Sequence, residues 1–276
     1  MNSTLLFSLL FLVTIFPLKI AAQTNLPLTR TENRMLLSFQ YQHPFFKNTS
    51  TEFKVLSGSY DLSIVAPISR TLSIVGTLPF AGYSATSPLF TESSGAIANI
   101  SMGISNVSVP GYSILNVKIF LPTAPSRGIN SGAMMYGLYH RFYELEQYLP
   151  EALSLQIHYF YKRNFNGLMI GGVIGGTGLI STGRRSDELG ILARYGVSMG
   201  YENKDLRIVA EFLGIGILTR IRITSQNDFE HFIALSGQWS GGNVVKPKVN
   251  IHLPLSHNLS RIYGWSLMIG SDVVLP

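Results

Sequence analysis

The segment VLSGSYDLSIVAPISRTLSIVGTL, residues 55–78, decides the fold class of this 276-residue chain. Its even positions from 56 to 66 carry Leu, Gly, Tyr, Leu, Ile and Ala, whereas the odd positions from 57 to 63 carry Ser, Ser, Asp and Ser. After a turn at 67–70, the same alternation resumes and continues to residue 78. Because successive side chains of a strand point to opposite faces, the segment predicts a β-hairpin with one apolar and one polar face.

This period of two recurs along the chain and predicts thirteen strands. They cover residues 34–42, 55–66, 71–79, 96–106, 112–121, 131–142, 153–162, 167–176, 189–200, 206–217, 229–239, 245–254 and 261–271. Strands of soluble domains usually have about five or six residues, whereas a tilted strand that crosses a bilayer needs about nine to eleven. A bacterial membrane barrel has an even number of strands. We therefore expect about twelve strands, within a range of 12–14, and expect one of the thirteen assignments to be wrong.

Low charge favours a membrane setting for the apolar face. Charged residues make up 13% of the chain, against roughly 25% in ordinary soluble domains. The polar face consists mostly of Ser, Thr, Asn and Gly, which suits a wet or hydrogen-bonded lumen. The sequence therefore predicts an all-β, antiparallel transmembrane β-barrel. A soluble secreted β-protein, with the apolar face turned inward, remains the alternative.

The N-terminus has the features of an export signal. Residues 5–18 are apolar apart from Ser8 and Thr14, and Ala21-Ala22 follow before polar residues. This length is typical of a signal-peptide core and too short for a membrane span. We predict a signal peptide over residues 1–22, cleaved near Ala22, and one barrel domain over 23–276 in the cell outer membrane. A buried N-terminal helix is the alternative.

Several kinds of site find no support in the sequence. Cysteine is absent, which excludes disulfides, thiolate metal sites and a cysteine nucleophile. The net charge is +6, but no Lys/Arg-rich run exists, so nucleic-acid binding has little support. No HExxH, phosphate-binding loop or GxSxG elbow occurs. We predict no cofactor, no metal and no enzymatic activity; a lipid-modifying barrel enzyme remains an alternative.

Residues 165–182 raise a rival interpretation, because they contain no charge and, within residues 171–176, two overlapping GxxxG spacings. In an apolar helix such spacings mark a close-packed membrane dimer face. Six glycines between 167 and 178 would weaken a helix. We therefore expect a strand here and keep a single membrane helix as the alternative.

Parity predicts which polar side chains point into the lumen. The candidates are Asp61, Asn99, Lys118, His158, Arg194, Arg207, Glu211, Lys248, Asn250 and His252. Pairing Tyr201 with Leu206 would place Arg194 opposite Leu213, with Glu211 as its diagonal neighbour. Such charges either set the selectivity of a pore or tie the wall together as an internal salt bridge. An excess of inward cations predicts a mild preference for anions.

Three short motifs carry a resemblance to a known family. One strand ends in Leu78-Pro79, the next begins with GAIANISMGI at 95–104, and a third ends in Leu121-Pro122-Thr123. This order resembles the outer-membrane barrels named for the meta-pathway of phenol degradation, which are distantly similar to the fatty-acid transporter barrels. Ala98-Asn99 stands where that family has Gly-Asp, and Ala124 where it has Gly. The resemblance implies a barrel of about twelve strands that passes small hydrophobic molecules.

Taken with the strand pattern, these observations predict an outer-membrane channel or transporter for the passive passage of small molecules, hydrophobic ones among them. Its expected partners are outer-membrane lipid on the apolar face and a small solute or hydrophobic ligand in the lumen. A structural or adhesion barrel with a plugged lumen is the alternative. The sequence does not indicate the oligomeric state.

Overall fold

A computed structural model describes residues 34–47, 52–53, 57–86, 91–108, 113–183, 189–219, 229–242 and 244–275. The predicted signal peptide, residues 1–22, lies outside the described residues.

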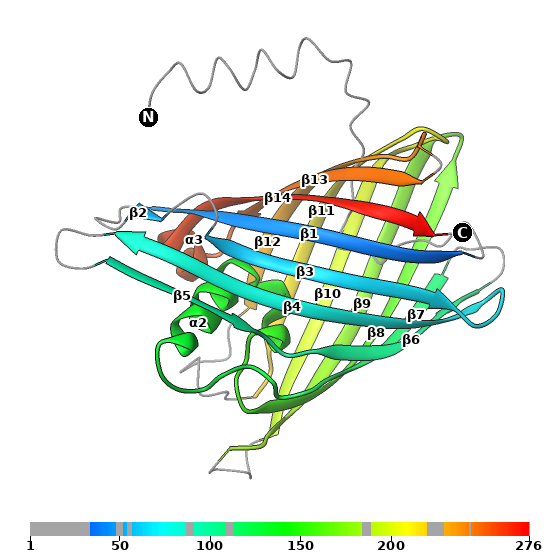
Figure 1. Cartoon of the computed structure of the whole chain (residues 1–276). Helices are drawn as coiled ribbons and strands as arrows, with labels where there is room; N and C mark the ends of the chain where they lie inside the picture. Colours follow the sequence, from blue (N-terminus) through cyan, green and yellow to red (C-terminus); the bar gives the residue numbers. More distant parts are fainter. Residues whose placement is uncertain are drawn as a thin grey trace, which may run out of the picture.

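The described residues form strands with three short helical segments between them (Figure 1). In chain order the elements are β1 (Met35–Phe46), β2 (Glu52–Phe53), β3 (Gly58–Pro67), β4 (Leu72–Thr86), β5 (Thr91–Ile97), β6 (Ser101–Val107), β7 (Ser113–Phe120), α2 (Asn130–His140), the 3-10 helix η1 (Phe142–Gln147), β8 (Ala152–Phe165), β9 (Leu168–Ser181), β10 (Leu189–Glu202), β11 (Leu206–Ile217), β12 (Phe229–Trp239), β13 (Val245–Pro254), α3 (His257–Ile262) and β14 (Tyr263–Leu275).

The strands close into one antiparallel barrel. They form a 14-stranded sheet in which β1 pairs with β14, and β4 pairs with β6 to complete the circle. β5 and β6 both pair with β4, one after the other, and so count as one interrupted wall strand. The two-residue β2 pairs with the end of β4 and prolongs the line of β3. Without β2, and with β5 and β6 taken as one, the wall has twelve strands, which confirms the predicted fold class.

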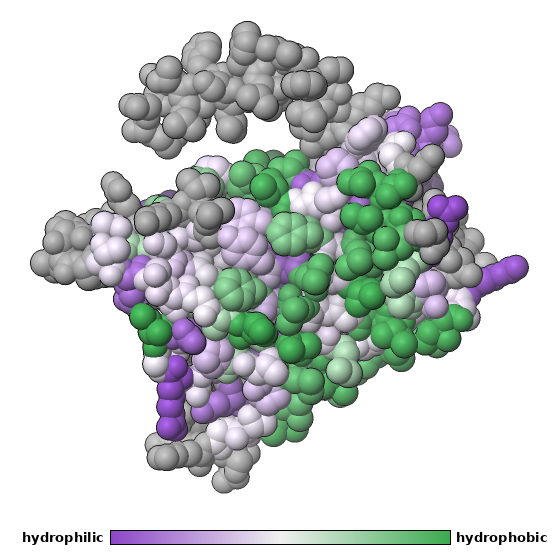
Figure 2. All heavy atoms as spheres, in the orientation of Figure 1, coloured by the Kyte–Doolittle hydropathy of each residue, from purple (hydrophilic) through white to green (hydrophobic). Residues whose placement is uncertain are grey.

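The apolar face of the wall points outward. Leu62 and Ile64 are 48% and 38% exposed, whereas Asp61, on the other face of the same strand, is 4% exposed. Figure 2 shows apolar side chains gathered over the middle of the visible face, with more polar ones over the end that holds α2. An outward apolar band around a polar interior is the arrangement of membrane barrels and the reverse of a soluble barrel.

The two ends of the barrel differ in their connections. The connections at 68–71, 166–167 and 203–205 are short and lie at the end where β1 begins and β14 ends. The turn between β8 and β9 consists of Asn166 and Gly167, both at positive φ (53° and 96°), as a two-residue hairpin turn requires. α2, η1 and α3 occupy the other end (Figure 1).

One predicted strand is a helix. Residues 131–142 form most of α2 and the start of η1. Ala133, Met134, Gly137 and Leu138 are buried, which is the i, i+1, i+4, i+5 spacing of a helix face. Apolar residues at 134, 136 and 138 fit period two equally well, and periodicity cannot separate a strand from a buried helix over so short a run. This was the wrong assignment among the thirteen.

The structure also decides between a strand and a membrane helix for the glycine-rich stretch. Residues 168–181 form β9, paired along its length with β8 and β10. The helix alternative is therefore wrong. No helix of the described residues is long and apolar enough to cross a membrane.

Candidate functional site

The segment between β7 and β8, residues 121–151, folds into the lumen and is called the lumen insert here. It contains α2, which contacts β4 and β5, and η1, which contacts β11. The chain changes direction between the two helices at Arg141, whose φ and ψ are −111° and 31°. The insert therefore lies across one mouth of the barrel and reaches into its interior (Figure 1).

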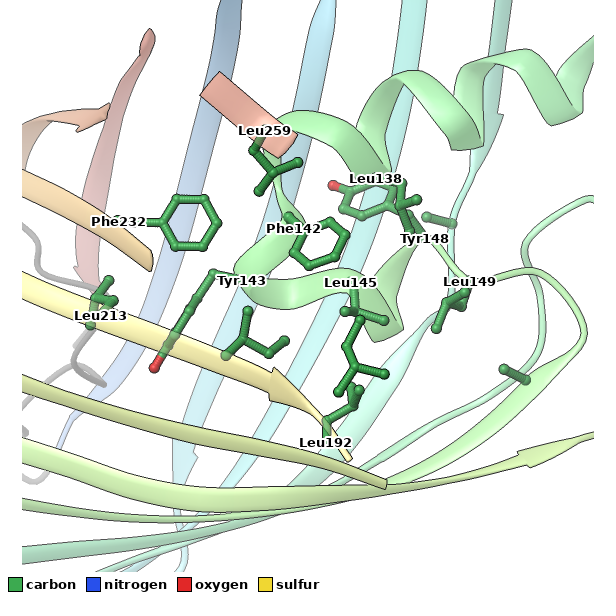
Figure 3. Close-up of a cluster of buried hydrophobic side chains, with 14 of the residues drawn as sticks. Leu138, Phe142, Tyr143, Leu145, Tyr148, Leu149, Leu192, Leu213, Phe232 and Leu259 are labelled. Carbon is green, nitrogen blue, oxygen red and sulfur yellow. The ribbon is translucent and has the colours of Figure 1, made fainter. Parts of the chain in front are cut away.

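An apolar cluster packs the insert against the wall (Figure 3). Tyr148 is fully buried, and Leu138 and Leu145 are 1% and 2% exposed. The close-up shows Tyr143 facing Phe232, and Leu145 above Leu192 of the wall. A buried side chain of this size contributes about 1.5–3 kcal/mol, so the cluster stabilises the inserted position.

Asn99 attaches the insert where the wall strand is interrupted. It lies between β5 and β6 and is fully buried. Its amide nitrogen donates to the carbonyls of Glu146 (2.8 Å) and Leu149 (2.6 Å), and its amide oxygen accepts from the backbone N–H of Ala124 (2.9 Å). The predicted inward residue Asn99 is thus a clamp for both ends of the insert.

A buried ion pair joins the insert to the opposite wall. Arg194 contacts Glu146 of η1, and both side chains are fully buried. The guanidinium also donates to the Tyr143 carbonyl (2.8 Å) and to the Thr177 hydroxyl (2.6 Å). Burial raises the pKa of Glu146, and the charge of Arg194 opposes that rise.

The expected proximity of Arg194 to Glu211 is wrong. The register pairs Tyr201 with Ile208 and Arg194 with Ile215, two residues from the predicted pairing. A shift of two preserves which face each side chain is on, so Arg194 and Glu211 both remain inward. However, Glu211 now lies opposite Ser198, and the insert supplies the acid for Arg194.

A second charged group anchors the bend of the insert. Arg141 contacts Asp61 of β3 and Glu144 of η1 (2.6 Å), and donates to the amide oxygen of Gln42 (3.1 Å). The Gln42 amide nitrogen in turn donates to the His140 carbonyl (3.1 Å). The predicted inward residue Asp61 therefore binds the insert.

His140 forms a neutral anchor beside this group. Its Nδ1 lies 2.7 Å from the Tyr136 carbonyl and its Nε2 lies 3.0 Å from the Ser59 hydroxyl. A proton on Nδ1 and a lone pair on Nε2 satisfy both contacts. Burial, with a contribution from the Arg141 charge, lowers the pKa of His140 to about 3, so the ring is neutral at physiological pH.

The remaining predicted lumen residues lie on the wall, and the structure places all ten on its inner side. His158, Arg207, Glu211, Lys248, Asn250 and His252 are buried, and Lys118 is half-buried. Lys248 pairs with Asp272 and donates to the Ser38 hydroxyl (2.6 Å). The acids Glu144, Glu146 and Asp272, which sequence reasoning missed, offset the inward cations. The basis for the predicted anion preference is therefore removed.

A polar cavity of about 160 Å³ lies in the lumen next to η1. Its wall comes from β1, β3, β4, β6, β7, β8 and β14, and Arg141, Tyr143, Glu144 and Gln147 of the insert face it. The cavity collects three of the predicted residues, Asp61, Lys118 and His158. Among the described residues, no group of three or more His, Cys, Asp or Glu side chains could hold a metal ion.

Comparisons with known proteins place this geometry among outer-membrane barrels. No protein-family profile matches the chain, and no curated protein matches it. The structure is similar to that of an outer-membrane channel from Pseudomonas putida F1, at 11% identity and a TM-score of 0.58, covering 92% of this chain and 100% of that one. It is also similar to the beta domain of the Bordetella autotransporter BrkA, at 9% identity and a TM-score of 0.56, covering 88% of this chain and 99% of that one. A third similar structure is the NanC porin, at 8% identity and a TM-score of 0.51, covering 87% of this chain and 100% of that one.

These likenesses show the fold of an outer-membrane β-barrel. At such low identities they do not assign a solute. The resemblance to the phenol meta-pathway barrels is supported as far as the barrel architecture and not in its finer assignment.

Proposed function

We propose that this protein is an outer-membrane channel for small polar solutes, held closed by its own lumen insert. The observation that carries the proposal is the way in which the insert is held. It occupies the lumen as an addition to a complete twelve-stranded wall, and discrete polar contacts from Asn99, Arg194 and Asp61 fasten it. These contacts can be released without unpairing any wall strand, which is the property that a gate needs.

The outward apolar face and the outer-membrane barrels to which the chain is similar support a location in the outer membrane. The polar lining of the cavity favours polar solutes over the hydrophobic ones that the family resemblance implies. The signal peptide and the absence of enzymatic activity stay predictions.

A structural or adhesion barrel is the second candidate, because the apolar cluster of Figure 3 would hold the insert in place permanently. Conductance through planar lipid bilayers separates the two candidates. Glu146→Gln removes the charge that holds η1 to Arg194, and we expect it to raise the open probability at least tenfold above the wild type.

Asp272→Asn is the matched control, because it breaks a buried ion pair within the wall and leaves the insert untouched. We expect no comparable opening from this variant. If the wild type and Glu146→Gln are both electrically silent while both insert as folded barrels, the channel proposal is wrong and the structural barrel is supported.

A further inference from the structure

We infer that the cavity next to η1 is a binding site for a small, uncharged polyol. The inference rests on the proposed function, because it names the class of solute that the channel would take.

Unpartnered polar atoms converge on this cavity from both the wall and the insert. Within the described part of the chain, five lining residues each carry a buried side-chain atom that makes no hydrogen bond. These atoms are Asp61 Oδ1, Asn116 Oδ1, Arg141 Nε, Gln147 Oε1 and His158 Nε2. Every one of these residues is more than nine-tenths buried. Buried polar atoms are nearly always hydrogen-bonded, so five at one cavity require a polar partner there, either water or a polar solute.

The wall places two of these residues side by side. Asn116 of β7 lies directly opposite His158 of β8, and both point inward. Directly opposed side chains have Cβ atoms about 4.5–5.5 Å apart, so one small molecule can reach both. Gln147 faces them from the insert, so a bound solute would contact the wall and the gate together.

The charges of the cavity favour a neutral ligand. Its lining holds two acids, Asp61 and Glu144, and two bases, Lys118 and Arg141, which sum to zero. Arg141 is already paired with both acids. An anion would face these carboxylates, and a cation would face Arg141 and Lys118.

The mixture of unsatisfied donors and acceptors in the cavity determines which functional group the ligand must carry. Asn116 and Gln147 offer carbonyl oxygens and Arg141 offers an N–H. A hydroxyl both donates and accepts hydrogen bonds, so a molecule with several hydroxyls can satisfy such an array in full. A ligand that carries only acceptors, or no polar atom, cannot.

The volume limits the size of the ligand. An engineered cavity of about 150 Å³ binds benzene, so a cavity of about 160 Å³ admits a molecule of roughly six to ten non-hydrogen atoms. Glycerol, erythritol and xylitol span this range.

Saturation-transfer difference NMR on the full-length protein tests the inference. A zwitterionic detergent is required, because sugar headgroups would compete for the site. We expect transfer to erythritol that exceeds transfer to glycerate, butylammonium, alanine and toluene at equal concentration. Asn116→Leu should reduce the erythritol signal at least fivefold. Asn250→Leu makes the same change on an inward position of β13 outside the cavity and should leave the signal within twofold of the wild type.

No transfer to erythritol, stronger transfer to a charged, zwitterionic or apolar probe, or equal signals from Asn116→Leu and the wild type would each overturn the inference. Folding of Asn116→Leu is judged by whether heating changes its mobility on a denaturing gel, as it does for a folded barrel. If this variant does not fold, Gln147→Met on the insert takes its place. The measurement does not depend on conduction. If the protein conducts but does not bind erythritol, the polyol site is refuted and the channel is not. If the protein binds erythritol but no variant conducts, the channel is refuted and the polyol site is not.

Discussion

Removing either member of the Glu146–Arg194 pair should destabilise the barrel more than the pair itself stabilises it. Each side chain is fully buried, and leaving one buried charge without its partner costs about 3–5 kcal/mol. Glu146→Leu and Arg194→Met should therefore each lower the free energy of unfolding by about 3–5 kcal/mol, and their sum would be about 6–10 kcal/mol.

The double variant removes both charges. It leaves three neutral groups without a partner: the Tyr143 carbonyl and the Thr177 hydroxyl, which accept from Arg194 now, and the Gln156 amide, which donates to Glu146. Each orphaned neutral group costs about 1–3 kcal/mol, so we expect a total loss of about 3–9 kcal/mol. The difference between the midpoints of the two ranges, the sum of the single variants and the loss in the double variant, is then a coupling energy of about 2 kcal/mol.

Urea unfolding of the protein in lipid vesicles measures these values, followed by the fluorescence of Trp239 and Trp265, the two tryptophans of the chain. Far-UV circular dichroism on the same samples checks that each variant starts as a folded barrel. A double variant that is as unstable as the sum of the single variants would show that the two charges do not act on each other, and the insert would then be held by its other contacts and not by this ion pair.

Two further predictions concern acid and the hairpin turn. Between pH 6.5 and about 3, the unfolded chain binds a proton at His140 that the folded protein does not bind, so stability falls as the pH falls, by about 3 kcal/mol at pH 4. His140→Gln should flatten this dependence in urea titrations at several pH values, whereas His257→Gln, on the exposed start of α3, should not. Gly167→Val places a β-branched side chain at a φ of 96° with its Cβ 2.7 Å from the Tyr201 ring. We expect a loss of about 1–2 kcal/mol or more, against little change for Asn166→Gly; equal stability of the two variants would show that the turn conformation is unimportant.

The strands of the barrel wall could be predicted from the sequence because polar and apolar residues alternate along each of them. Alternation alone placed Asp61 and Arg194 on the inner face, and an error of two residues in the register of β10 and β11 did not alter that. The turn at Asn166-Gly167 was not predicted, although this dipeptide is a strong hairpin signal; the predicted strand 167–176 began at the turn glycine.

The insert could not be predicted in the same way. α2 is buried on most sides, so its apolar residues lack the clear stripe of a surface helix. The partners of the lumen charges also lie far away in the sequence: Glu146 is 48 residues from Arg194 and Arg141 is 80 from Asp61. Strand periodicity indicates that a charge points inward but says nothing of a partner outside the sheet.

The glycine-rich stretch that suggested a membrane helix has a different physical role in the barrel. Gly175 of β9 lies inward, directly between His158 of β8 and Arg194 of β10. A Cβ at this position would overlap the His158 ring and approach the carbonyl of Ile157. The missing side chain therefore leaves room for two large polar side chains on adjacent strands. His158 faces the cavity and Arg194 reaches Glu146 of the insert, so Gly175, a member of one GxxxG pair, makes room in the barrel wall for a ring that lines the cavity, beside the arginine that holds the insert.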